Sequence, residues 1–383
     1  MRPRPRRLER LPEQYFAGLL ARVAAATAEH GEDVVDLGRG NPDTPPPPHV
    51  LRRLVETAQE PSALVHGYAP FRGLPTLREA VAARYRDVYG VDVSAEDEVA
   101  VVPGTKTALV ELALCLADHG DAILLPDPGY PDYRSAVALA GARELTLPLD
   151  PAADWAPDLA AAPGDGVAAV YLNYPSNPCA AAAPGGVFED AVAYAERSGA
   201  AVVHDFAYGD LVFEGRAPRS FLATAGAIDV GVELFSMSKS YGMAGWRLGF
   251  VLGNREIVAR LNELQDQVRA GIWRPVQEAG VVALAGPEGA VEERRELYER
   301  RRSRVLAELG ETRATEVRSE GSFFVWLRLP AHATADGLLA EHRVALAPGE
   351  GFGAQGAGWA RISLATPDGR LDLGLERLLA ALR

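Results

Sequence analysis

The stretch "SMSKSYGMAGWRLGF", residues 236–250, contains one of only two lysines among the 39 lysine and arginine residues of this chain. The sequence uses arginine almost wherever it needs a positive charge, so Lys239 requires a chemical explanation. A primary amine condenses with an aldehyde to form an imine, whereas a guanidinium group does not. We therefore predict that Lys239 is a Schiff-base lysine; taken alone, it could also be an ordinary surface lysine.

The neighbours of Lys239 indicate which aldehyde it would bind. Ser236 and Ser238 precede the lysine, and Arg247 follows it by eight residues. Two hydroxyls and a cation suit a phosphate group close to the amine. An imine-forming lysine beside a phosphate site points to pyridoxal 5'-phosphate as the cofactor.

The segment "HDFAYGDL", residues 204–211, supplies partners for the ring of such a cofactor. Asp205 follows an apolar run, and an anion beside the pyridine nitrogen keeps the ring protonated and electron-withdrawing. By itself Asp205 could equally be a helix N-cap or a turn residue. Tyr208 and Asn177 favour the cofactor interpretation, because both can bond the phenolic oxygen of the ring.

The segment "VPGTKTALVEL", residues 102–112, predicts a strand, a glycine turn and a helix. The first backbone N–H groups of that helix, at Gly104, Thr105 and Lys106, would then be available to a phosphate. Many α/β proteins have such a turn without a ligand. We expect Lys106 to act through its backbone more than through its amine. As a candidate Schiff-base lysine, it is less favoured than Lys239.

Two further predictions each have a simpler alternative. Tyr130 in "PDPGYPDY" suits stacking on the cofactor ring, with Tyr133 behind it, but both aromatics could merely pack in the core. Arg361 in "ARISLA" suits a two-pronged contact with a substrate carboxylate. In so arginine-rich a chain, a solvated arginine is the alternative.

Short apolar runs alternate with helical stretches from about residue 98 to 255, which predicts an α/β fold with a mostly parallel sheet flanked by helices. The expected strands are "EVAVVPG", "AILLPDPGY", "VAAVYLNYP", "AVVHDFAYG", "VELFSMSKS" and "WRLGFVLGN". Polar residues follow several of these runs, at the strand ends where such sheets bind ligands. After Gly280 come a charged helix and the strands "GSFFVWLRL" and "ARISLA". We predict an N-terminal segment, 1–45, that contributes to a small domain, a large cofactor-binding domain, 46–284, and a small C-terminal domain, 285–383.

The composition excludes several classes of function. With 383 residues and a net charge of −13, the chain is long enough to bury a ligand and is unsuited to non-specific nucleic-acid binding. It has no apolar run that would span a bilayer. The segment "LPEQYFAGLLARVAAATAEHG" predicts an amphipathic helix instead of an apolar signal core, so we expect a cytoplasmic protein. Cys115 and Cys179 have neither disulfide-framework nor metal-site spacing.

In their order along nearly the whole chain, these motifs resemble the class I/II aminotransferases of the fold-type I pyridoxal-phosphate family. The resemblance implies that Lys239 is the Schiff-base residue, that Asp205 lies at the ring nitrogen and that Tyr208 lies at the phenolic oxygen. "LNYPSNP" is similar to the family's asparagine motif, so Asn177 would contact both the phenolic oxygen and the substrate carboxylate. "VPGTKTAL" resembles the phosphate loop and "DPGYPDY" the segment of the stacking aromatic.

Further implications concern the substrate and the subunits. Arg361 matches the carboxylate-binding arginine, and Gly40 in "LGRGNPD" matches the glycine beside the substrate. "HGYAPFRGLPTLREAVA" resembles the segment whose tyrosine, here Tyr68, reaches the phosphate of the neighbouring subunit. The resemblance thus implies a homodimer with shared active sites that acts on amino acids and 2-oxo acids, without nucleic-acid or membrane partners. The segments "HDFAYGDLVFEG" and "KSYGMAGWRLGFVLGN" most resemble those of the branch that contains alanine, diaminopimelate and methionine-salvage aminotransferases.

Two departures from the family pattern concern substrate identity. The family's "NPTG" is here "NPCA", residues 177–180, and Trp273 and Arg274 stand where smaller or less basic residues are usual. Arg274, Arg39 and Tyr15 are candidates for the side-chain pocket, and a basic residue there suits an acidic or polar substrate. Alternatively, Arg274 pairs with a carboxylate of the protein.

Other activities share the same motifs. A carbon–sulfur β-lyase or an oxidative or cyclising amino-acid enzyme would use the same cofactor residues, so these remain alternatives to transamination. A ligand-sensing regulator would need a DNA-binding module, and only about 35 residues precede the first matched motif. A non-catalytic scaffold would tolerate loss of Lys239 or Asp205, and the chain keeps both.

Overall fold

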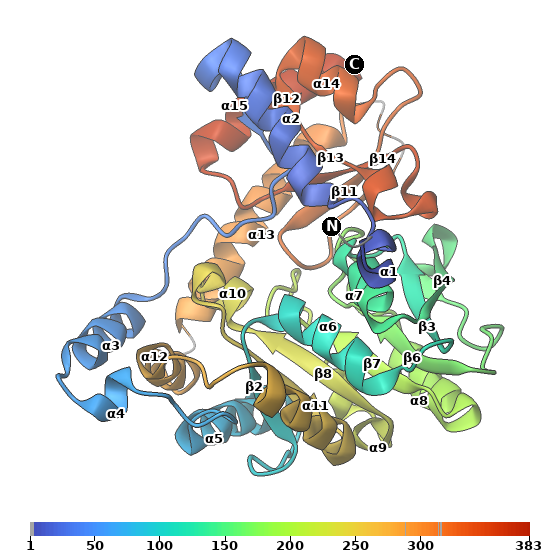
Figure 1. Cartoon of the computed structure of the whole chain (residues 1–383). Coiled ribbons are helices and arrows are strands. Elements are labelled where there is room, and N and C mark those ends of the chain that lie inside the picture. Colours follow the sequence, from blue (N-terminus) through green and yellow to red (C-terminus); the bar gives the residue numbers. More distant parts are fainter. Residues whose placement is uncertain (1–3, 288, 313, 315) are drawn as a thin grey trace.

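The computed structural model describes residues 4–287, 289–312, 314 and 316–383. In these ranges the chain forms an eight-stranded, a four-stranded and a two-stranded sheet (Figure 1). The strands of the large sheet lie in the order β2 (Val99–Val102), β9 (Gly249–Gly253), β8 (Gly231–Ser236), β7 (Ala201–Asp205), β6 (Val167–Leu172), β3 (Ala122–Asp127), β4 (Arg143–Asp150) and β5 (Ala156–Pro157). All run in the same direction except β9 and β5. The predicted α/β class with a mostly parallel sheet is confirmed.

The two strands that sequence reasoning missed in this sheet are β4 and β5. Both lie at one edge, where they pair antiparallel with each other. Arg143 and Glu144 of β4 are exposed, so this strand lacks the continuous apolar run of a strand buried on both faces. An edge strand of mixed polarity gives a weak sequence signal.

Side chains alternate between the two faces of the large sheet, and each face is covered by helices. In β2, Val99 and Val101 pack into one core, whereas Ala100 and Val102 pack into another. The first core includes helices α5 (Pro75–Arg84), α8 (Val187–Ser198) and α12 (Arg274–Leu284). The second includes α6 (Thr105–Leu116), α7 (Asp132–Ala140) and α11 (Arg255–Val268). Because helices cover both faces of this sheet, the ends of its strands are where polar groups can meet a ligand.

A second layer combines both ends of the chain. Its four-stranded sheet has the order β10 (Val317–Arg318), β11 (Phe324–Arg328), β14 (Trp359–Ser363) and β13 (Ala347–Pro348), with helices α13 (Gly289–Leu309), α14 (Ala335–His342) and α15 (Asp368–Leu382). The short strand β1 (Val35–Asp36) pairs parallel with β12 (Val344–Ala345). Val35 and Leu37 share a buried core with Tyr298 and Leu375. The N-terminal segment is therefore tied to C-terminal residues, and we keep 1–45, 46–284 and 285–383 as proposed domain limits.

The remaining helices are α1 (Arg6–Glu9), α2 (Tyr15–His30), α3 (Pro48–Gln59), α4 (Ala63–His66), α9 (Ala227–Val230) and α10 (Met237–Ser240). Helix α2 confirms the predicted amphipathic helix. Between β1 and α3 the chain runs from the second layer down to the level of the large sheet (Figure 1). Within the described ranges, no helix is long and apolar enough to cross a membrane.

Candidate active site

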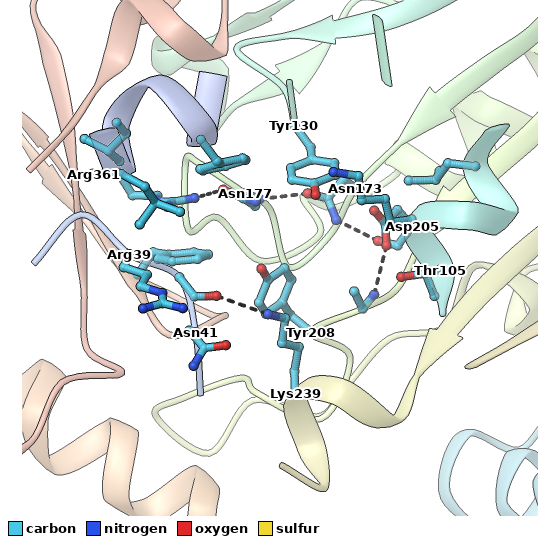
Figure 2. Close-up of a pocket in the computed structure, with 18 residues that line it drawn as sticks. Arg39, Asn41, Thr105, Tyr130, Asn173, Asn177, Asp205, Tyr208, Lys239 and Arg361 are labelled. Atoms are coloured by element: carbon cyan, nitrogen blue, oxygen red, sulfur yellow. Dashed lines mark hydrogen bonds between the residues drawn. The ribbon is translucent and has the colours of Figure 1, made fainter. Parts of the chain in front are cut away.

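A cavity of about 280 Å³ lies at the carboxyl ends of β6 and β7, with β11, β14 and α2 contributing to its wall (Figure 2). The position agrees with the rule that open α/β sheets bind ligands outside the carboxyl ends of their strands. The predicted site residues that line it are Gly40, Thr105, Lys106, Tyr130, Asn177, Asp205, Tyr208, Lys239 and Arg361. Segments far apart in the sequence thus meet around one space.

Lys239 reaches the cavity from the single turn of α10. Its Nζ donates a hydrogen bond to the carbonyl oxygen of Gly40, at 3.2 Å. Burial, followed by the positive charges of Arg361 and Arg247, lowers the pKa of Lys239 to about 8. A substantial fraction of this amine is therefore neutral near physiological pH and able to act as a nucleophile or a base.

Gly40 allows this approach because it has no side chain. A Cβ atom at this position would lie 2.9 Å from the Phe324 ring and 3.4 Å from the guanidinium of Arg361. The segment between β1 and α3 can therefore lie against the cavity wall, and the Gly40 carbonyl in it accepts the hydrogen bond from Lys239.

Asp205 is the last residue of β7, and its carboxylate is buried. Its Oδ2 accepts a hydrogen bond from the Tyr133 hydroxyl at 2.9 Å, and its Oδ1 accepts one from the Ala207 amide at 3.2 Å. Burial raises the pKa of Asp205, and the hydrogen bond from Tyr133 opposes that effect. The carboxylate forms no salt bridge with any residue in the described ranges. It therefore suits a ligand that brings its own positive charge.

Arg361 on β14 is 1% exposed and lines the cavity. Its guanidinium donates to Asn177 Oδ1 at 2.6 Å and to the Gly38 carbonyl at 3.0 Å, while its Nε has no partner among the described residues. The guanidinium carbon lies 3.9 Å from the centre of the Phe324 ring. A buried cation with neutral partners suits an incoming carboxylate.

Asn177 is held in place by its neighbour Asn173. The backbone amide of Asn177 donates to Asn173 Oδ1 at 2.7 Å, and Asn173 Nδ2 donates to the carbonyl of Asp205 at 2.7 Å. This chain of bonds joins Arg361, the loop after β6 and the end of β7 (Figure 2). Asn173 is one of the polar residues expected at the strand ends, and its hydrogen bonds make it a positioning residue for Asn177.

Tyr208 is also buried beside the cavity, and burial raises the pKa of its hydroxyl, which therefore stays protonated. Its ring packs edge-on against Phe323 and Phe324. A protonated hydroxyl can donate a hydrogen bond to an anionic oxygen of a ligand.

Two of the predicted phosphate residues, Gly104 and Arg247, lie against each other. Gly104 has φ +85° and caps α6, and a Cβ atom there would lie 2.2 Å from Arg247 Nη2. Ser236 Oγ accepts the amide of Ser238 at 3.2 Å, which starts α10. Gly104, Ser236, Ser238 and Arg247 are not among the residues that line the cavity. The closely placed guanidinium and helix start nevertheless suit an anion.

Lys106 and Tyr130 line the cavity, and both interact with the carboxylate of Asp132. Lys106 Nζ lies 2.9 Å from Asp132 Oδ2, and Gln14 Nε2 donates to Asp132 Oδ1 at 2.9 Å. The Tyr130 ring lies 5.5 Å from that of Tyr133 and 5.9 Å from that of Phe16. The ion pair of Lys106 distinguishes it from Lys239, which has a carbonyl oxygen as its partner.

Tyr68, Arg274 and Tyr15 do not line the cavity. Tyr68 is 92% exposed. Arg274 pairs with Glu278 at 3.0 Å, which supports the alternative that this arginine binds a protein carboxylate. The Tyr15 hydroxyl donates to the Pro348 carbonyl at 2.8 Å.

The turn "NPCA" keeps the backbone form that a glycine would adopt. Ala180 has φ +53°, in the left-handed region that disfavours side chains by about 1–2 kcal/mol. Its carbonyl accepts the amides of Glu320 at 2.7 Å and Gly321 at 3.0 Å. These bonds help to hold the strained turn against the second layer, and Cys179 beside it is buried.

The wall that sequence reasoning missed is apolar. Phe16, Leu19 and Leu20 of α2 and Phe324 of β11 line the cavity. Residues 16, 19 and 20 have the i, i+3, i+4 spacing of one helix face, which was a usable signal. That spacing shows that the three residues share one face of the helix. It does not show which part of the protein that face packs against.

Comparisons with known proteins place the whole chain in one family. Residues 32–378 match the family model for aminotransferase class I and II. The chain is 43% identical, over 97% of its length and 94% of the relative's, to L-glutamine--4-(methylsulfanyl)-2-oxobutanoate aminotransferase of Bacillus subtilis. It is 36% identical to LL-diaminopimelate aminotransferase of Moorella thermoacetica, over 97% of both chains.

A solved structure supports the same assignment. The substrate-bound structure of BacF from Bacillus subtilis, a protein named as a transaminase, superposes with a TM-score of 0.93 at 36% identity and covers 99% of this chain and 98% of that one. These matches favour transamination over the lyase, oxidative and cyclising alternatives. The chain belongs to the class I and II aminotransferases of fold type I and transfers an amino group between an amino acid and a 2-oxo acid.

Proposed function

We propose that this aminotransferase uses pyridoxal 5'-phosphate and that Lys239 is its Schiff-base lysine and catalytic base. One observation carries the proposal. A lysine amine whose pKa is lowered to about 8 shares a cavity with a buried carboxylate, Asp205, and a buried guanidinium, Arg361.

The residues present fit this cofactor. Asp205 is a buried anion without a cationic partner in the described ranges, as a protonated ring nitrogen requires. A side chain at position 104 would collide with the Arg247 guanidinium, so glycine keeps a helix start and a cation together for a phosphate. Tyr208 supplies a protonated hydroxyl for the phenolic oxygen. Each polar part of the cofactor thus has a matching group.

The proposed roles follow from these placements. Bound pyridoxal phosphate supplies an aldehyde that condenses with amines and a protonated ring that withdraws electrons from the substrate's α-carbon. Asp205 holds the proton on the ring nitrogen, and Asn177 and Tyr208 orient the phenolic oxygen. Arg361 and Asn177 hold the substrate carboxylate beside Gly40. Lys239 Nζ takes the proton from the α-carbon as a positioned base.

The other cofactor contacts are also proposals. Tyr130 would stack on the ring, with Tyr133 supporting both Tyr130 and Asp205. The phosphate would be held by Gly104, Thr105, Lys106, Ser236, Ser238 and Arg247, with Lys106 acting through its backbone because its amine pairs with Asp132.

We also propose a homodimer, in which Tyr68 reaches the phosphate of the partner subunit's cofactor. Exposed large apolar side chains in this part of the chain, at Leu64, Tyr68 and Phe71, support a surface that a second copy covers. The cytoplasm is the proposed location, because Cys115 and Cys179 are both free thiols.

A donor and acceptor panel tests the activity directly. Amino acids are paired with pyruvate, 2-oxoglutarate and 4-methylthio-2-oxobutanoate, and both the products and the cofactor spectrum are recorded. We expect amino-group transfer that depends on the acceptor. Release of pyruvate and ammonia without an acceptor would instead identify a lyase.

Replacing Arg361 with glutamine should raise KM for the amino donor by about 10- to 100-fold, because a charge-assisted contact with the α-carboxylate is lost. Glutamine is polar and uncharged, so the substitution removes the positive charge without placing an apolar side chain at this buried position. Steady-state kinetics and equilibrium binding of a simple carboxylate check the result. Wild-type affinity for carboxylates in this variant would exclude Arg361 from substrate binding.

The reactivity of Lys239 should follow the pKa of about 8. In protein freed of cofactor, the fraction of neutral amine rises roughly tenfold per pH unit below that value and levels off above it. Brief acetylation from pH 6 to 10, followed by peptide mass spectrometry, measures the rate. Lys106 is the only other lysine and gives an internal comparison. A Lys239 rate that still rises tenfold between pH 9 and 10 would contradict the lowered pKa.

A further inference from the structure

We propose that Arg39 determines the substrate class by binding the side-chain carboxylate of a dicarboxylic amino acid of glutamate type, and the matching carboxylate of its 2-oxo acid. This inference rests on the proposed function, in which Arg361 binds the α-carboxylate.

Among the basic side chains of the cavity, that of Arg39 is the one without a hydrogen-bond or ion-pair partner in the described part of the chain. Four basic side chains line the cavity, those of Arg39, Lys106, Lys239 and Arg361. Lys106 pairs with Asp132, Lys239 bonds the Gly40 carbonyl, and Arg361 bonds Asn177 and Gly38. The guanidinium of Arg39 has no hydrogen bond or ion pair with any residue in the described ranges. Its charge is available to a ligand.

The other two candidates for side-chain recognition are engaged elsewhere. Arg274 lies 3.0 Å from Glu278, which also pairs with Arg53 at 3.0 Å. The Tyr15 hydroxyl is bonded to the Pro348 carbonyl. Of the three residues that the sequence suggested for the side-chain pocket, Arg39 is therefore the one that lines the cavity.

The backbone of Arg39 is held firmly although its side chain is free. Asp36 Oδ1 accepts the amides of Gly38 at 2.9 Å and of Arg39 at 3.1 Å, which forms a tight turn. The backbone position of Arg39 is thus fixed, and the next residue along the chain, Gly40, is the one whose carbonyl accepts the hydrogen bond from Lys239 Nζ.

The two arginines lie at different depths, which predicts a ligand with two anionic ends. Arg361 is buried, whereas Arg39 is exposed. Both line the cavity, and in the view of Figure 2 Arg39 lies between Arg361 and Asn41. A substrate with its α-carboxylate on Arg361 and its α-carbon near Lys239 can direct its side chain toward Arg39.

Part of the cavity wall is apolar. Phe16, Leu19 and Leu20 of α2 line the cavity, and the centre of the Phe16 ring lies 5.6 Å from the guanidinium carbon of Arg361. Such a wall suits the methylene groups of a side chain, while the charged tip contacts a guanidinium that can form two parallel hydrogen bonds with a carboxylate. Asp205 is the acidic residue in the cavity lining, and its proposed partner is the ring nitrogen, so no lining carboxylate competes for Arg39.

The test compares R39Q and R39K with the wild-type holoenzyme. R260Q is the matched control, because Arg260 is an exposed arginine on α11 and pairs with Glu256 outside the cavity. Each protein is assayed with glutamate and 2-oxoglutarate and, separately, with alanine and pyruvate. Calorimetric titration with glutarate and with butyrate measures binding independently of turnover.

We expect R39Q to lose about 10- to 100-fold in kcat/KM for glutamate and in affinity for glutarate, the range for loss of a charge-assisted contact. Values for alanine and butyrate should change less than about threefold, R39K should recover most of the loss, and R260Q should match the wild type. Equal losses with both donors, or no loss with glutamate, would overturn the role of Arg39. If the wild type transfers no amino group from any donor, the proposed function itself fails.

Discussion

Lys239→Ala is expected to reduce turnover by at least about a thousandfold, because it removes both the imine-forming amine and the base that takes the α-proton. Single-turnover absorbance changes on mixing with an amino donor measure the effect without interference from product release. Lys106, whose amine pairs with Asp132, cannot take over either role.

Lys239→Arg is the matched control for this substitution. It keeps a positive charge near Gly40 and Asp205 but provides no primary amine. We expect K239R to be as inactive as K239A, with circular dichroism and melting temperature close to those of the wild type. Turnover above about a tenth of the wild-type value in K239R would show that only the charge matters, and the assignment of Lys239 would fall.

Asp205→Asn should lower kcat by about 10²- to 10⁴-fold, with a smaller effect on KM. An amide cannot stabilise a protonated ring nitrogen as a carboxylate does, so the electron-withdrawing form of the cofactor is lost. The measurement is kcat and KM for the donor, together with the cofactor spectrum between pH 6 and 9.

The control for Asp205 is Tyr133→Phe. This change removes one hydrogen bond, the one from the Tyr133 hydroxyl at 2.9 Å, and leaves the carboxylate in place. Because that bond lowers the pKa of Asp205, its loss should raise that pKa further and reduce activity less than tenfold. If D205N and Y133F are equally active, the charge of Asp205 is not what the reaction requires.

Most candidate site residues could be predicted from short sequence motifs. Lys239, Asp205 and Asn177 each stand in a short motif whose residue types match one chemical need. Their convergence was predictable because polar residues that follow parallel strands meet at one edge of a sheet. Strands buried on both faces were predicted well, whereas β4, with exposed Arg143 and Glu144, was missed.

The burial, the pairing and the pKa of each group could not be predicted from local sequence. The lowered pKa of Lys239 depends on burial and on Arg361, which is 122 positions away in the chain. Likewise, the sequence could not show that Arg274 pairs with Glu278 whereas the Arg39 guanidinium has no partner among the described residues, because either arginine could have had a carboxylate partner.

By itself the sequence predicted the candidate reactive groups and the buried strands that precede them along the chain, because residue chemistry and hydrophobic periodicity are local properties. The tertiary structure decided which charges are buried, which are paired and which remain available, because those depend on contacts between distant segments. The amine of Lys239 and its neighbouring motif together predicted a site residue, but its environment followed only from the packing of α2, the segment between β1 and α3, and β14 around one cavity. The same is true of the Arg39 guanidinium, which has no partner among the described residues.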